Sequence, residues 1–317
     1  MAFLIGTDEA GYGPNLGPLT IGGTLWQVPE TAVDLYEVLK AVVASRRQTN
    51  RLVVADSKQV YQSGQSIERL ERTVLAFLHL ASDAIPTSFH QLGGLLGGEP
   101  EELGPGYAGV GDIALPLCAK RSDIESDSAR LRRSLAAAGC ALQGCRVATI
   151  FPSRFNSAVE KLGNKAELLS SETLQLAGQL LTERPEGDES DILIGCDKHG
   201  GRSKYAGMLN QYLTDEFVKI ERETMELSQY EWEWGGAAVS ICFQARGEKQ
   251  LPIALASMLA KYVREVAMLG WNHFWQQKLP GIKPTQGYPV DARRFKKEIA
   301  ELQRNLGIDD HLIWRSR

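Results

Sequence analysis

Two adjacent carboxylates, Asp8 and Glu9, stand close behind a short apolar run near the start of the chain, AFLIG. A turn rich in glycine and proline follows at once over residues 11–18. Glycine lets the backbone approach a ligand closely, and carboxylate oxygens are the ligands that hard divalent cations prefer. We therefore expect a buried strand over residues 2–8 that delivers acids to a site where a metal is held against phosphate.

The composition is that of an ordinary globular protein. The chain has 317 residues, of which 43% are hydrophobic and 23% charged, which suits one large domain or two modest ones. No run approaches the roughly 18 apolar residues that a membrane span needs, and the N-terminus lacks the basic and apolar regions of a signal peptide. We expect a monomer with no membrane partner.

Cysteine usage and net charge narrow the class of protein further. The five cysteines are odd in number and form no CxxC pair, which argues against a disulfide framework and against a structural zinc site. A reducing cytoplasm is the expected location. The net charge is −4, so any binding of nucleic acid must come from a local basic patch or a bridging metal.

Hydrophobic periodicity and turn residues predict an α/β chain with a mixed sheet. The expected strands and hairpin cover residues 2–8, 19–28, 51–58, 145–156, 191–197 and 224–245, and the expected helices cover residues 31–45, 66–81, 165–183, 203–221, 252–271 and 291–305. Residues 82–142 combine a Gly/Pro-rich stretch with a charged helical one, and we interpret them as an insertion or small subdomain. The main domain would then comprise residues 1–81 and 143–317.

Two further acids occupy informative positions. Asp197 ends an apolar strand, as Asp8 does, and ligand sites in open α/β sheets form at the carboxyl ends of strands. Glu265 continues a polar stripe of Ser257 and Lys261, spaced four residues apart on one helix. Two Mg²⁺ ions held by such acids can activate a water and stabilise the leaving oxygen of a phosphodiester.

Plainer interpretations of these acids remain open. Asp197 alone would also suit a turn or helix cap, and Glu265 would also suit a surface ion pair with Lys261. Adjacent strand residues point to opposite faces, so Asp8 and Glu9 reach one ion only if the chain bends or if Glu9 binds from the flank.

The stretch DEAGYGPNLGPL resembles the opening motif of the type 2 ribonucleases H (ribonuclease HII), DEAGRGPLAGPV, with Tyr12 in place of the arginine. Further stretches resemble the family in the same order: ADSK, ILIGCDKHGG, ICFQARGEKQLPIALASMLAKYVRE, GYPVDARRF and RNLGIDDHLIWRSR. The likeness covers most of the chain apart from residues 82–142 and a hairpin near 222–236.

This resemblance implies a ribonuclease H-like fold, with a central mixed five-stranded sheet flanked by helices, a helical C-terminal part and an inserted segment. It also implies Mg²⁺ or Mn²⁺ as cofactor. The four metal-binding, catalytic acids of the family fall on Asp8, Glu9, Asp197 and Glu265, the last of which is aspartate in the family.

The resemblance further implies contacts to substrate. The amides of Gly11, Tyr12 and Gly13 would read 2′-hydroxyls at an RNA–DNA junction, and Tyr288 would stack on the adjacent deoxyribose. The cations that would follow the phosphate backbone are Lys58, Lys198, His199, Arg202, Lys204 and Lys261. Each of them would also suit a solvated surface, and His199 would suit either a proton shuttle or a packed, hydrogen-bonded imidazole.

Three functions are therefore compared. The first is a metal-dependent endonuclease that cuts the RNA strand of RNA–DNA hybrids and leaves 5′-phosphate and 3′-hydroxyl ends. The second is a nucleic-acid-binding protein of this fold with weak, lost or altered nuclease activity, such as one acting on junctions. The third, a dinucleotide-binding enzyme, is disfavoured because the third glycine comes one residue late and the two acids would repel a pyrophosphate.

Overall fold

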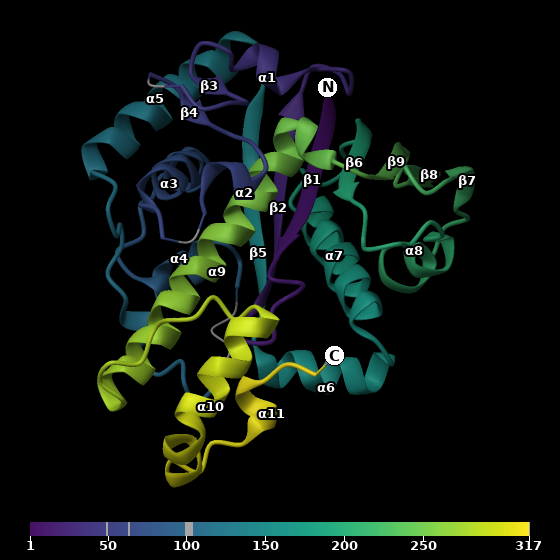
Figure 1. Cartoon of the computed structure of the whole chain (residues 1–317). Helices are drawn as coiled ribbons and strands as arrows, with labels where there is room; N and C mark the ends of the chain where they lie inside the picture. Colours follow the sequence, from purple (N-terminus) through teal and green to yellow (C-terminus); the bar gives the residue numbers. More distant parts are fainter. Residues whose placement is uncertain (49, 63, 99–103, 317) are drawn as a thin grey trace.

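The computed structural model describes residues 1–48, 50–62, 64–98 and 104–316 (Figure 1). Its strands are β1 (Ala2–Ala10), β2 (Leu19–Val28), β3 (Val43–Ala44), β4 (Leu52–Val53), β5 (Ala141–Ile150), β6 (Asp191–Asp197), β7 (Lys219–Glu223), β8 (Leu227–Trp234) and β9 (Ala237–Gln244). Its α-helices are α1 (Leu35–Val38), α2 (Ser57–Val60), α3 (Glu68–Ser82), α4 (Phe89–Leu95), α5 (Arg121–Ala137), α6 (Pro152–Leu162), α7 (Lys165–Thr182), α8 (Ala206–Tyr212), α9 (Leu251–Lys278), α10 (Pro289–Asn305) and α11 (Asp310–Ile313). Two short 3₁₀ helices are η1 (Val110–Asp112) and η2 (Gly247–Lys249).

The central sheet has seven strands in the order β5-β2-β1-β6-β9-β8-β7, where five were predicted. Strands β1, β6 and β9 run parallel to one another, whereas the pairs at both ends of the sheet are antiparallel. The mixed α/β architecture is thus confirmed, and the number of strands is corrected. Strands β8 and β7 extend the sheet beyond β9; β8 lies in the hairpin predicted over residues 224–245, whereas β7 was not predicted.

The prediction of one helix over residues 203–221 is wrong, and this error hid the edge strand. Helix α8 ends at Tyr212, and the side chain of Asn210 then donates hydrogen bonds to the carbonyls of Thr214 and Glu216. These bonds turn the chain into β7, which pairs with β8. Because β7 is a charged, exposed strand with one partner, its sequence carries little of the apolar pattern that marks a strand.

Residues 31–58 are also less regular than predicted. The helix expected over 31–45 is reduced to the single turn α1, and the strand expected over 51–58 to the two residues of β4. The strand ends early because the side chain of Asp56 accepts a hydrogen bond from the Lys58 amide and caps α2.

Helix α9 lies directly on β1 and β2, crossing the face of the sheet seen in Figure 1. Glycines permit this close approach: a Cβ added to Gly6 would lie 2.3 Å from the carbonyl carbon of Pro252, and one added to Gly22 would lie 2.1 Å from the Ala256 oxygen. The hydroxyl of Thr20 further donates to the Ala260 carbonyl at 2.9 Å. This contact fixes which helical residues face the end of β1.

The opposite face of the sheet is covered by α7. Leu176 and Leu180 of α7 approach the backbone of Gly23 on β2, and apolar residues of β1, β6 and β9 form a common core with α7 and α8. The strands that carry the predicted acids are therefore held between two long helices, with their carboxyl ends at one edge.

Residues of the 82–142 segment pack into the core formed by α3, α9 and β5. A fully buried carboxylate, Glu71 of α3, joins these parts of the molecule. It accepts hydrogen bonds from the amides of Leu117, Cys118 and Ala119 at 2.6, 2.6 and 2.8 Å, and from the Tyr262 hydroxyl at 2.8 Å.

In the described part of the chain, no helix has the length and apolar character required to cross a membrane.

Candidate active site

Asp8 lies near the end of β1 and faces α9. Its cross-strand partner on β2 is Gly22, which lies against α9, and paired residues of neighbouring strands share a face. The Asp8 carboxylate accepts a hydrogen bond from the Glu9 amide at 2.7 Å and lies near Ser257 of α9, whose hydroxyl donates to that of Ser57 at 3.2 Å. Asp8 is therefore held at the edge of the sheet by its own backbone and by the helix above it.

Glu9 points to the other face of the sheet, as strand alternation predicts. Its partner on β2 is Ile21, which packs among residues of α6 and α7. Even so, the carboxylates of Glu9 and Asp197 interact electrostatically. The two adjacent acids thus approach the same edge from opposite sides of β1.

Asp197 ends β6, which runs parallel to β1 with Cys196 opposite Thr7. This register places Asp197 beside Asp8 at the carboxyl ends of the two strands. Its Oδ1 accepts a hydrogen bond of 3.1 Å from the amide of Gly247, in the short helix η2 that follows β9.

Glu248, the next residue of η2, was missed in the sequence analysis. It is partly buried, and after burial its charge is the next cause that raises the pKa of Asp197, so it lies within electrostatic reach of that acid. No strand-end pattern marks it in the sequence, because Glu248 lies four residues beyond Gln244, the last residue of β9. Recognising it requires knowing that β9 lies parallel to β6.

Three of the acids hold their protons unusually tightly. Burial, together with the charges of Glu9 and Asp197, raises the pKa of Asp8 well above its ordinary value. Burial and the charge of Asp197 raise the pKa of Glu9 to about 7, and burial followed by the charge of Glu248 raises the pKa of Asp197. Like charges in a partly dehydrated site repel one another, and a divalent cation would relieve that repulsion.

The donor set therefore fits a hard cation chemically, although it is not preassembled. Within the described residues, no group of three or more acidic, histidine or cysteine side chains is already positioned to hold one ion. Asp8 and Asp197 are instead engaged with neighbouring donors.

The structure does not place Glu265 with the other predicted acids. It lies eight residues beyond Ser257 on α9, which is about 12 Å along the helix axis at 1.5 Å per residue. Its buried carboxylate is paired with Lys261 at 2.7 Å and lies 3.8 Å from Arg264. Burial, followed by the charge of Glu265, raises the pKa of the Tyr61 phenol to about 12.

Of the predicted cations on the α9 side of the sheet, Lys58 lies near the acids and Lys261 lies with Glu265. Lys58 is exposed, and its charge lowers the pKa of both Glu9 and Asp197, so it lies near the acids. Lys261 is engaged with Glu265 and lies 5.6 Å over the Tyr61 ring.

Lys198 and His199 serve the packing of the loop that follows β6. The Lys198 ammonium donates to the Thr224 carbonyl at 2.7 Å and to the Ser228 hydroxyl at 2.9 Å. His199 is only 3% exposed and hydrogen-bonds Ser170 through Nδ1 at 2.9 Å. Burial lowers the pKa of His199 to about 3, so its imidazole is neutral and packed. Exposed Lys204 and partly exposed Arg202 follow, the latter paired with Glu167 at 2.8 Å.

The turn over residues 11–18 is supported from beneath by Arg315, which is 1% exposed. Its guanidinium donates to the carbonyls of Gly11 at 2.6 Å and of Pro14 at 3.0 Å. Gly11 has a φ of +85°, and a Cβ there would lie 2.5 Å from Nε of Arg264, so only glycine fits. Gly13 is exposed and has open space around its Cα.

Tyr288 lies beside this turn, where the resemblance implied a stacking residue. The carbonyl of its neighbour Gly287 accepts hydrogen bonds from the amides of Asn15 at 2.8 Å and Leu16 at 3.3 Å. The Tyr288 side chain is 50% exposed. The structure thus brings an accessible aromatic ring and the glycine turn together from opposite ends of the sequence.

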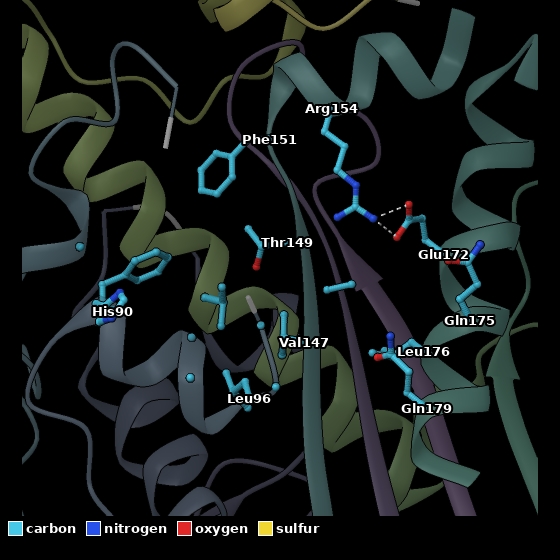
Figure 2. A pocket seen from close by; sticks show the side chains of 18 residues that line it. His90, Leu96, Val147, Thr149, Phe151, Arg154, Glu172, Gln175, Leu176 and Gln179 are labelled. Atoms are coloured by element: carbon cyan, nitrogen blue, oxygen red, sulfur yellow. Dashed lines mark hydrogen bonds and ion pairs between the residues drawn. The ribbon is translucent and has the colours of Figure 1, made fainter. Parts of the chain in front are cut away.

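A separate cavity of about 380 Å³ lies along the outer edge of β5, between α4 and α7. Figure 2 shows Phe151 and Thr149 of this region with Arg154 paired to Glu172 on α7 at 2.8 Å. None of the site residues predicted from the sequence lines this cavity.

No protein-family model matches the sequence, and no curated protein matches it significantly. Among solved structures, the chain is similar to a mutant of Bst-RNase HIII, with a TM-score of 0.50 and 13% identity over 99% of this chain and 66% of that one. It is also similar to a chain of the PCNA:RNase HII complex from Archaeoglobus fulgidus (TM-score 0.46, 14% identity, 99% and 94% covered). A third similar structure is ribonuclease H2 from Pyrococcus horikoshii OT3 (TM-score 0.42, 17% identity, 98% and 92% covered).

These likenesses concern the fold. Together with the mixed sheet and its flanking helices, the likeness to Bst-RNase HIII shows that the chain has the fold of the type 2 ribonucleases H. The fold implied by the resemblance of the N-terminal motif is therefore confirmed.

Proposed function

We propose that this protein is a metal-dependent endonuclease that hydrolyses the RNA strand of RNA–DNA hybrids. The observation that carries the proposal is the meeting of Asp8, Glu9 and Asp197 at one edge of the sheet with mutually raised pKa values. Strongly perturbed carboxyl groups that gather at strand ends are typical of functional sites.

We propose Asp8, Glu9, Asp197 and Glu248 as the residues that would hold Mg²⁺ or Mn²⁺. Glu248 replaces Glu265 in this set because the charge of Glu248 acts on Asp197. Glu265 is paired with Lys261 and lies about two helical turns beyond Ser257 on α9. Bound divalent ions would supply an activated water and stabilise the leaving oxygen. The Asp8 carboxylate is oriented by the Glu9 amide, and that of Asp197 by the Gly247 amide.

Substrate would be engaged next to the acids by the glycine turn and Tyr288. Arg315 takes up the carbonyls of Gly11 and Pro14, and Gly13 is open to solvent. This arrangement supports contact between the backbone of the turn and the 2′-hydroxyls of RNA, the group that distinguishes RNA from DNA. Lys58 adds a cation on the α9 side of the acids, suited to a phosphate.

Cleavage of a labelled RNA–DNA hybrid tests this function, with the wild type assayed in Mg²⁺, in Mn²⁺ and in EDTA. The Asp8→Asn variant is compared after its folding has been checked by circular dichroism. We expect metal-dependent cutting of the RNA strand by the wild type and loss of cutting in the variant. Single-stranded RNA and duplex DNA serve as control substrates, and a duplex with one embedded ribonucleotide tests action at a junction.

A second candidate is a nucleic-acid-binding protein of this fold with weak or lost nuclease activity. The observation in its favour is that no three acids in the described residues are positioned as a ready ligand set. Hybrid binding without cutting in either metal would select this candidate and overturn the first.

A further inference from the structure

The Tyr12 ring lies at the tip of the glycine turn, on the α7 side of the sheet. It packs against the apolar cluster that contains Leu19, Ile21 and Leu169. After burial, the charge of Glu9 is the next contribution that raises the pKa of Tyr12, so the phenol lies within electrostatic reach of that acid. The ring therefore forms a partly buried platform beside the acidic edge.

Lys165 places its ammonium over this platform. Its Nζ lies 4.7 Å from the centre of the Tyr12 ring, a distance at which the ring attracts a cation. Lys165 is the first residue of α7, whose start is fixed by a hydrogen bond from the Glu167 amide to the Asn164 side chain at 2.9 Å. The position of the cation is thus set by a capped helix and by an aromatic face.

Lys165 and the neighbouring cation Arg202 differ in their partners, which are an aromatic ring for Lys165 and a carboxylate for Arg202. Arg202, which also acts on the Tyr12 phenol, is neutralised by Glu167 at 2.8 Å. No carboxylate of the described residues lies within 4.0 Å of Lys165. A cation held only by a ring keeps its charge available for an anion, whereas a cation in an ion pair must first lose its partner.

We propose that Lys165 contacts a phosphate of the bound nucleic acid, and that the Tyr12 ring is the positioning residue that holds its ammonium in place. This inference rests on the proposed function and deepens it. Lys58 serves the α9 face of the acids, and Lys165 serves the α7 face, toward which Glu9 points. A nucleic acid crossing the acidic edge would then meet one cation on each side.

The test compares Lys165→Gln and Lys165→Arg with the wild type. Binding of a fluorescent phosphorothioate hybrid is followed by anisotropy at several salt concentrations, and kcat and KM are measured on a cleavable hybrid. Lys165→Gln should weaken binding about five- to tenfold, lower the slope of log K against log salt by about one ion, and raise KM with little change in kcat. Lys165→Arg should restore both binding and slope.

The role of the ring is tested with Tyr12→Leu and Tyr12→Phe. Tyr12→Phe keeps the aromatic face and should behave like the wild type. Tyr12→Leu should weaken binding, and its effect should be much smaller when Lys165 is already glutamine, because the two residues act as one unit. Lys40→Gln, an exposed lysine on the turn after α1, is the matched control and should leave binding unchanged.

The outcomes separate the two proposals. An unchanged salt slope in Lys165→Gln would overturn the phosphate contact, and additive effects of the Tyr12 and Lys165 variants would overturn the positioning role of the ring. Wild-type binding without cutting would overturn the nuclease while the Lys165 comparison stays decisive. Failure of the wild type to bind the hybrid at low salt would overturn both.

Discussion

The backbone amide of Gly247 donates a hydrogen bond of 3.1 Å to the side chain of Asp197, joining the ends of two parallel strands. This bond brings Glu248, the next residue, into the field of Asp197. An acid that is remote in sequence thereby joins the edge where Asp8 and Glu9 meet.

Glu248→Gln should therefore have opposite effects with and without metal. Removing a like charge from beside Asp197 should make the metal-free protein more stable near pH 8, by about 1 kcal/mol. The same change should reduce Mg²⁺ affinity by about tenfold, because one carboxylate donor is lost. Thermal unfolding in EDTA and in increasing Mg²⁺ measures both effects.

Glu265→Gln is the matched comparison, since it is the acid first predicted for the site. It should leave Mg²⁺ affinity nearly unchanged and should lower stability, because Lys261 loses its buried partner. A larger loss of Mg²⁺ affinity in Glu265→Gln than in Glu248→Gln would reverse our assignment.

Glu9 should make the metal-free protein less stable as the pH rises. Its pKa is raised from 4.5 to about 7, so between these values the folded state binds more protons than the unfolded state. Stability must then fall as the pH rises from about 4.5 through about 7. Urea unfolding in EDTA at pH 4 and pH 8 should show that Glu9→Gln removes about 1–3 kcal/mol of this loss. An equal pH dependence in both proteins would contradict the burial of Glu9.

Arg315→Ala should disturb the glycine turn from beneath. The carbonyls of Gly11 and Pro14 would lose their buried donor, at a cost of about 3 kcal/mol in the free energy of unfolding. Because the turn is part of the proposed substrate contact, KM should also rise. Arg293→Ala, which changes an exposed arginine on α10, is the control and should alter neither value. A normal KM in a destabilised Arg315→Ala protein would separate the turn from substrate binding.

Glu71→Gln should loosen the 82–142 segment. The amide nitrogen of glutamine would face backbone N–H groups that now donate to a carboxylate, which should cost about 2–4 kcal/mol. Hydrogen exchange at Leu117 and Ala119 should accelerate, because those amides lose their acceptor. Exposed Glu68, on the same helix, provides the control variant Glu68→Gln. Unchanged protection in Glu71→Gln would show that other contacts hold the segment.

The acids at strand ends were the most predictable part of the site. Asp8 and Asp197 each follow a local apolar run, and the rule that sites form at carboxyl ends of strands needs no knowledge of the whole fold. Glu248 could not be found in this way, because its role depends on β9 lying beside β6, and 39 residues of chain separate the two strands. Long-range pairing of this kind leaves no local pattern.

The structure pairs Glu265 with Lys261, and the geometry of the helix explains why. Spacings of four residues correctly put Ser257, Lys261 and Glu265 on one face of α9, but each spacing also advances along the helix. Of these three, Ser257 lies nearest to Asp8, whose partner Gly22 packs against Ala256. The sheet was underestimated for a related reason, since β7 is recognisable as a strand only through its pairing with β8.

Arg315 is 301 residues from Pro14 in the sequence, yet its guanidinium donates a hydrogen bond to the Pro14 carbonyl. At roughly 5–20 residues per second, a ribosome needs about 15–60 s to make the intervening chain. Throughout that interval a nascent chain already carries Asp8 and Glu9 but lacks the guanidinium beneath its first turn. The turn therefore acquires these hydrogen bonds only after Arg315 has been translated.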